Sequence, residues 1–89
     1  MEYILYTFES TTDAMLAEMT VTNEKIRARL VPLLPEIDAG CGLALRFEKD
    51  FDKEVKEIFS KNSLSFQKRY RLIYGENERK PKVLEYDLL

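Results

Sequence analysis

The sequence predicts an α+β domain in which two helices cover one face of a four-stranded antiparallel sheet. Two observations lead to this prediction. Segments with alternating apolar residues and segments with a helical apolar stripe follow one another in the order β-α-β-β-α-β. The chain is also short, with 89 residues of which 45% are hydrophobic and 34% charged, which is typical of a single globular domain with a modest core. This order of elements is that of the ferredoxin-like sandwich.

The first half of the chain contains a strand, a helix and a second strand. Residues 3–8 alternate along an aromatic-rich stretch and predict the first strand. Residues 10–13, Ser-Thr-Thr-Asp, predict the N-terminal cap of the first helix because their hydroxyls and carboxylate can accept hydrogen bonds from free backbone N–H groups. The run 26–34 is rich in leucine and β-branched residues and predicts a second strand, which Pro32 and Pro35 either end or restrict to a sheet edge.

The second half repeats this alternation. Residues 43–47 predict the third strand, and residues 66–74 predict a fourth in which aromatic and leucine side chains alternate with polar ones. We interpret the basic run within the fourth strand, residues 68–71, as a solvated strand face. Between these strands, apolar residues at i, i+4, i+7 and i+8 predict the second helix. They are Phe51, Val55, Ile58 and Phe59.

The sequence divides into a domain over residues 1–75 and a charged linker with a C-terminal extension over residues 76–89. The apolar end of this extension, residues 83–89, is expected to add an edge strand or to pack on a partner. A formal net charge of −2 gives no general drive toward nucleic acid or anionic membrane. The N-terminus has neither the basic region nor the long apolar stretch of a signal peptide, so we expect a cytoplasmic protein with no membrane segment.

The single cysteine, Cys41, lies between Gly40 and Gly42 in the connection between the second and third predicted strands. Flanking glycines provide no side-chain cover, so an accessible thiol is expected, whereas the alternative is a cysteine packed as a small hydrophobe. The predicted topology places this connection beside the start of the first helix, where the free N–H groups favour an anion. The residues that Cys41 is expected to face there are Ser10, Thr11 and Thr12.

A thiolate or persulfide at this helix start would need no histidine, and the chain contains none. One cysteine without histidine also argues against a zinc site, and a hard cation would need several converging oxygen ligands. We therefore expect no metal and no cofactor.

The segment 31–46, which contains Cys41, and the segment 10–14 together resemble the small selenium/sulfur carrier-like proteins of anaerobic bacteria. The resemblance covers roughly residues 3–74. In that family a second proline and an arginine precede the cysteine loop, and Leu34 and Pro35 replace them here, which removes a cation from the loop. The positions that do correspond to the family pattern are Ser10, Thr11, Asp13, Ala14, Pro32, Glu36, Cys41 and Gly42.

The resemblance implies a carrier that is not an enzyme. Cys41 would accept sulfur or selenium from a cysteine desulfurase-type donor, hold it as a persulfide or selenopersulfide, and release it to an acceptor enzyme. The alternative is a regulatory or interaction module that binds a small ligand or a protein partner. RNA binding through Arg69 and Arg71 ranks third, because the third strand lacks the aromatic pattern of RNA-binding domains with this fold. Surplus apolar residues on the first helix also predict a homodimer.

Overall fold

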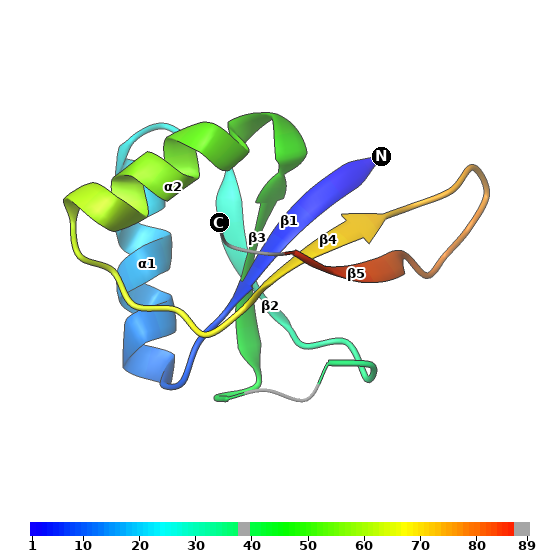
Figure 1. Ribbon diagram of the computed structural model, residues 1–89, viewed down its shortest axis with the longest axis horizontal. Coiled ribbons are helices and arrows are strands. Elements are labelled where there is room, and N and C mark those ends of the chain that lie inside the picture. Colours follow the sequence, from blue (N-terminus) through cyan, green and yellow to red (C-terminus); the bar gives the residue numbers. More distant parts are fainter. Residues whose placement is uncertain (38–39, 87–89) are drawn as a thin grey trace.

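The computed structural model, which describes residues 1–37 and 40–86 and only the backbone at residue 86, is an α+β sandwich (Figure 1). Both helices lie on one side of the sheet. The elements in chain order are β1 (Glu2–Thr7), α1 (Thr11–Asn23), β2 (Ala28–Pro32), β3 (Leu43–Glu48), the 3-10 turn η1 (Lys49–Phe51), α2 (Asp52–Lys61), β4 (Arg69–Ile73) and β5 (Lys82–Tyr86).

The five strands form a sheet in the order β2-β3-β1-β4-β5, and each neighbouring pair is antiparallel. The prediction of a ferredoxin-like sandwich with an extra edge strand is therefore confirmed. The apolar C-terminal segment supplies that strand as far as residue 86, whereas residues 87–89 lie outside the described part of the chain.

The main core lies between the helices and the sheet, and aromatic rings fill its centre. The ring of Tyr6 on β1 lies 4.6 Å from that of Phe59 on α2 and 4.8 Å from that of Phe66, measured between centroids. The predicted apolar stripe of the second helix is confirmed for Val55, Ile58 and Phe59, which are buried. Phe51 belongs instead to η1 and is only partly buried.

The opposite face of the sheet is partly covered by the connection between β2 and β3. Ile37 in this connection is 6% exposed and belongs to a second apolar cluster with Leu5, Ala44 and Leu72 from three different strands. The second strand is predicted over residues 26–34, whereas β2 spans only Ala28–Pro32, so the prediction is too long at both ends. The last residues of the predicted strand leave the sheet edge after Pro32 and fold over this face instead.

The prediction of a solvated face for the basic run 68–71 is wrong for Arg69. The register pairs Arg69 with Tyr6 and Arg71 with Ile4, so both arginines lie on the helix-covered side of the sheet. Arg69 is 1% exposed. Tyr70 and Leu72 consequently point to the opposite face, where they pack in the second apolar cluster.

Candidate functional site

The loop that carries Cys41 lies beside the residue that leads into α1. The backbone N–H of Cys41 donates to the carbonyl oxygen of Phe8 at 3.1 Å, and Ser10 is the N-cap of α1 two residues further on. The Ser10 hydroxyl accepts a hydrogen bond from the Asp13 N–H at 3.1 Å. The fold thus brings the cysteine loop to the start of α1, as the topology of the sandwich requires.

The two threonines expected beside Cys41 occupy the first turn of α1. Thr11 and Thr12 are both exposed, and within the described residues neither hydroxyl makes a hydrogen bond to Cys41. The N–H groups of Asp13 and Ala14 are satisfied by hydrogen bonds to Ser10, whereas the backbone N–H groups of Thr11 and Thr12 make none within the described part of the chain.

The glycines on either side of Cys41 both have left-handed backbone conformations, with φ of 46° at Gly40 and 82° at Gly42. A Cβ atom at Gly40 would lie 1.8 Å from the carbonyl oxygen of Phe8, so no other residue fits there without moving the backbone. A Cβ at Gly42 would meet open space. Gly40 is therefore what allows the loop to approach β1 closely enough for the hydrogen bond of Cys41.

Cys41 itself is partly buried. This degree of burial lies between the accessible thiol and the packed cysteine that the sequence allows. The Cys41 side chain packs against the main core, and its thiol donates a weak hydrogen bond to the carbonyl oxygen of Leu43 at 3.8 Å. The sulfur is thus held in a defined position while part of the residue remains accessible.

Gln67 lies beside this loop and was not anticipated from the sequence. A Cβ at Gly40 would lie 2.7 Å from its Oε1 atom, and its backbone N–H donates to the Thr7 carbonyl oxygen at 2.8 Å. This contact joins segments far apart in the chain, and no local pattern signals it. The polar side chain next to the thiol loop therefore comes from the segment that leads into β4.

Both arginines of β4 form ion pairs with carboxylates of the protein. Arg69 pairs with Asp52 at the start of α2 at 2.6 Å, and Arg71 pairs with Glu2 at 2.9 Å. Glu2 also pairs with Lys49, and the Lys49 and Arg71 cations lower the pKa of its carboxyl group. These contacts argue against nucleic-acid binding through Arg69 and Arg71, because both cations already have carboxylate partners.

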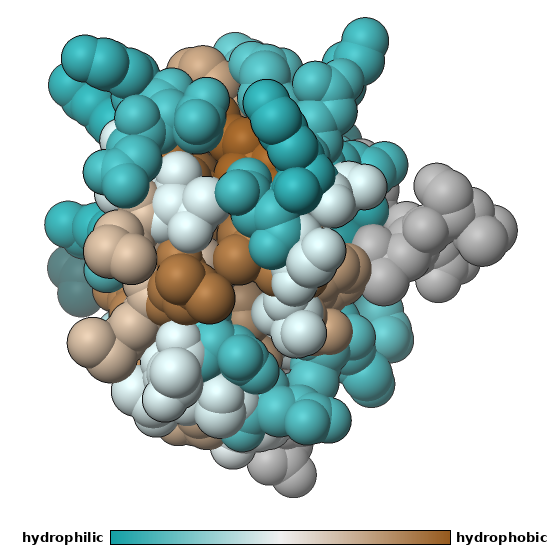
Figure 2. All heavy atoms as spheres, turned by 90° about the vertical axis from the view of Figure 1, so that its left-hand side faces the viewer, coloured by the Kyte–Doolittle hydropathy of each residue, from teal (hydrophilic) through white to brown (hydrophobic). Residues whose placement is uncertain are grey.

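The outer side of α1 carries exposed apolar side chains. Met15, Leu16 and Met19 are 59%, 45% and 55% exposed. Figure 2 shows hydrophobic atoms gathered in the middle of the face formed by the two helices. We call Met15, Leu16 and Met19 the α1 patch.

Within the described residues there is no group of three or more histidine, cysteine, aspartate or glutamate side chains arranged to hold a metal ion. No helix in this part of the chain is long and apolar enough to cross a membrane.

Comparison with known proteins identifies one family. Residues 2–71 match the family model described as "Putative Se/S carrier protein-like". No curated protein and no solved structure matches the chain. The match includes β1, α1, the cysteine loop, α2 and part of β4.

Proposed function

The chain belongs to the family of Se/S carrier-like proteins, and we propose that it carries sulfur or selenium on Cys41 between two enzymes. The observation behind this assignment is the setting of the only thiol. Cys41 is partly buried, has a left-handed glycine on each side, and is hydrogen-bonded to the residue that leads into α1. In this role the chain is a cosubstrate and not a catalyst.

Loading is a transfer between two thiols that needs no external oxidant. The Cys41 thiolate attacks the outer sulfur of a cysteine persulfide on a desulfurase-type donor, a new S–S bond forms on Cys41, and the donor's cysteine thiolate leaves. Unloading reverses these roles, since a nucleophile of the acceptor enzyme takes the outer atom and the Cys41 thiolate leaves. A selenopersulfide follows the same sequence of steps with selenium as the outer atom.

The start of α1 supplies the electrostatic support in this proposal. The backbone N–H groups of Thr11 and Thr12 and the positive end of the helix dipole favour an anion near the loop. Gly40 and Gly42 add no side-chain cover of their own on either side of Cys41. We expect this chemistry in the cytoplasm, where thiols are kept reduced.

Incubation with a cysteine desulfurase and L-cysteine is expected to add the mass of one sulfur atom to the intact protein. The addition should map to the peptide that contains Cys41 and should disappear on treatment with a thiol reductant, because a persulfide is reducible. Intact-protein and peptide mass spectrometry measure both effects.

The Cys41→Ser variant is the matched control, since it removes the only thiol and little volume. It should gain no sulfur under the same conditions. A wild-type protein that stays unmodified with several desulfurases, or a Cys41→Ser variant that is modified equally, would show that the carrier assignment is wrong.

The α1 patch favours the second candidate function, a module that interacts with another protein. Methionine-rich exposed surfaces adapt to different partners, and a homodimer formed through this helix is the interaction expected from the sequence. A carrier also needs a surface on which its donor and acceptor enzymes bind, so the two functions are compatible.

We expect wild-type protein to self-associate at high concentration, and we expect the double substitution Met15→Lys, Met19→Lys to make it monomeric. Two cations on the α1 patch would have to be desolvated in the dimer. Analytical ultracentrifugation over a range of concentrations measures the change. Ser60→Lys, which adds a cation at an exposed position of α2, should leave the association intact. A wild-type protein that is monomeric throughout this range would contradict the prediction.

A further inference from the structure

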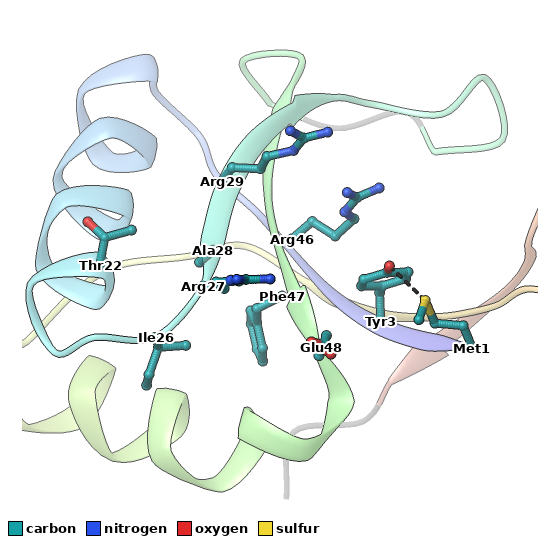
Figure 3. Close-up of a pocket in the computed structure, with 10 residues that line it drawn as sticks. All are labelled: Met1, Tyr3, Thr22, Ile26, Arg27, Ala28, Arg29, Arg46, Phe47 and Glu48. Atoms are coloured by element: carbon teal, nitrogen blue, oxygen red, sulfur yellow. Dashed lines mark hydrogen bonds between the residues drawn. The ribbon is translucent and has the colours of Figure 1, made fainter.

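Three arginines that form no ion pair with any described residue lie on the sheet face opposite the helices. Arg27 precedes β2, Arg29 lies within it, and Arg46 lies in the neighbouring strand β3. Figure 3 shows the three guanidinium groups directed to the same side of these strands, around a hollow that Tyr3 and Glu48 also line. We call this set of five residues the arginine hollow.

The arrangement is unfavourable without a ligand. Arg29 and Arg46 lie directly opposite each other in the β2–β3 register, and like charges at opposed positions destabilise a sheet. Within the described residues no ion pair is formed by Arg27, Arg29 or Arg46. By contrast, Arg69 and Arg71 on the other face both have carboxylate partners. A chain with a net charge of −2 therefore gathers three cations at one place without an ion-pair partner among residues 1–37 and 40–86.

The ring of Tyr3 packs against Arg46 in the hollow. The guanidinium carbon of Arg46 lies 4.6 Å from the centre of the Tyr3 ring, and the Tyr3 hydroxyl donates to the sulfur of Met1 at 2.9 Å. The Tyr74 ring packs edge-on against Tyr3 at 5.9 Å between centroids. These contacts hold the Arg46 guanidinium in place, and its N–H donors make no hydrogen bond within the part of the chain that the structure describes, which is the preorganisation that anion binding requires.

The side-chain charges of the hollow indicate the charge that a ligand should carry. Three arginines and Glu48 give the hollow a charge of 3 − 1 = +2. A phosphate monoester carries close to two negative charges near neutral pH, and its oxygens match the forked donors of arginine. We propose that the arginine hollow binds a small molecule through a phosphate dianion.

This site is separate from the cysteine loop. Arg27 and Glu48 lie where β2 begins and β3 ends, whereas Cys41 lies in the connection at the other end of the same two strands. The proposal therefore does not depend on the carrier role of Cys41.

The test is a titration of the full-length protein at constant ionic strength with AMP, inorganic phosphate and adenosine, followed by two-dimensional NMR. AMP is expected to bind and to shift the amide signals of residues 27–29 and 46–48, and adenosine, which lacks the phosphate, should not bind. Inorganic phosphate that shifts the same signals as strongly would identify the free ion as the ligand. Weaker binding of phosphate than of AMP would identify a phosphorylated small molecule.

The variants Arg29→Gln and Arg46→Gln should each weaken AMP binding by about tenfold, since each removes a charge-assisted hydrogen-bond donor. Arg79→Gln removes the same charge from the exposed β4–β5 connection and should leave binding unchanged. Thermal unfolding of each variant checks that it is folded.

Three results would overturn the proposal: no response to AMP or phosphate at millimolar concentration, equal binding of adenosine, or equal weakening by Arg79→Gln. An eight-nucleotide single-stranded RNA that binds far more tightly than AMP would also overturn it, because the surface would then be one for nucleic acid.

Discussion

Replacing Phe59 with alanine is expected to lower the free energy of unfolding by about 3 to 5 kcal/mol. Phe59 is 4% exposed, and its ring packs between those of Tyr6, Phe66 and Phe8 at centroid distances of 4.6, 5.6 and 6.3 Å. Removing it leaves a cavity that neighbouring rings can fill only in part. Urea unfolding followed by circular dichroism measures the loss.

Phe51→Ala is the matched control, because it removes the same side chain from a partly buried position in η1 just before α2. It should destabilise the protein less than Phe59→Ala. A decrease in the free energy of unfolding below about 1 kcal/mol for Phe59→Ala would mean that the apolar stripe of α2 contributes little to the stability of the core.

The fold could be predicted because local patterns and topology agree. The spacing of Val55, Ile58 and Phe59 predicted the buried side of α2, and the hydroxyl of Ser10 caps α1 as its sequence context indicates. Because β1 and β2 run in the same direction, the β2–β3 loop lies at the end of the sheet where α1 begins. The hydrogen bond between Cys41 and Phe8 follows from that placement.

The orientation of β4 could not be predicted, because it depends on contacts between distant segments. Alternation in the strand gives two faces but does not say which one the helices cover. The apolar residues Tyr70 and Leu72 suggest the face of β4 that the helices cover. Their side chains instead lie on the opposite face, which is partly covered by the loop around Ile37. The carboxylate of Asp52, seventeen positions before Arg69, allows the arginine to lie on the other side.

The arginine hollow was missed for a related reason. Arg27 precedes β2, Arg29 lies within it and Arg46 lies in β3, so no single run of the sequence contains all three. Only the register of β2 and β3 brings Arg29 opposite Arg46. The basic run that drew attention in the sequence, residues 68–71, contains two arginines that pair with carboxylates.

Replacing Asp52 with alanine is expected to lower the free energy of unfolding by about 3 to 5 kcal/mol. One Arg69 nitrogen donates to both carboxylate oxygens of Asp52, at 2.6 and 2.8 Å, and the Arg69 side chain is 1% exposed. Without Asp52 the arginine remains buried beside the Tyr6 ring and loses the carboxylate that accepts hydrogen bonds from its guanidinium group. Chemical denaturation measures the loss.

Two further variants separate the ion pair from a general effect of charge. Asp50→Ala removes an exposed carboxylate two residues earlier and should cost less than about 0.5 kcal/mol. The double variant Asp52→Ala, Arg69→Met should be more stable than Asp52→Ala alone, because it also removes the buried cation and leaves an apolar side chain of similar length among the aromatic rings. The opposite result is a fall in the free energy of unfolding of the double variant by the sum of the losses measured for Asp52→Ala and for Arg69→Met. The ion pair would then contribute no coupling energy, and the burial of Arg69 would result from its packing against Tyr6.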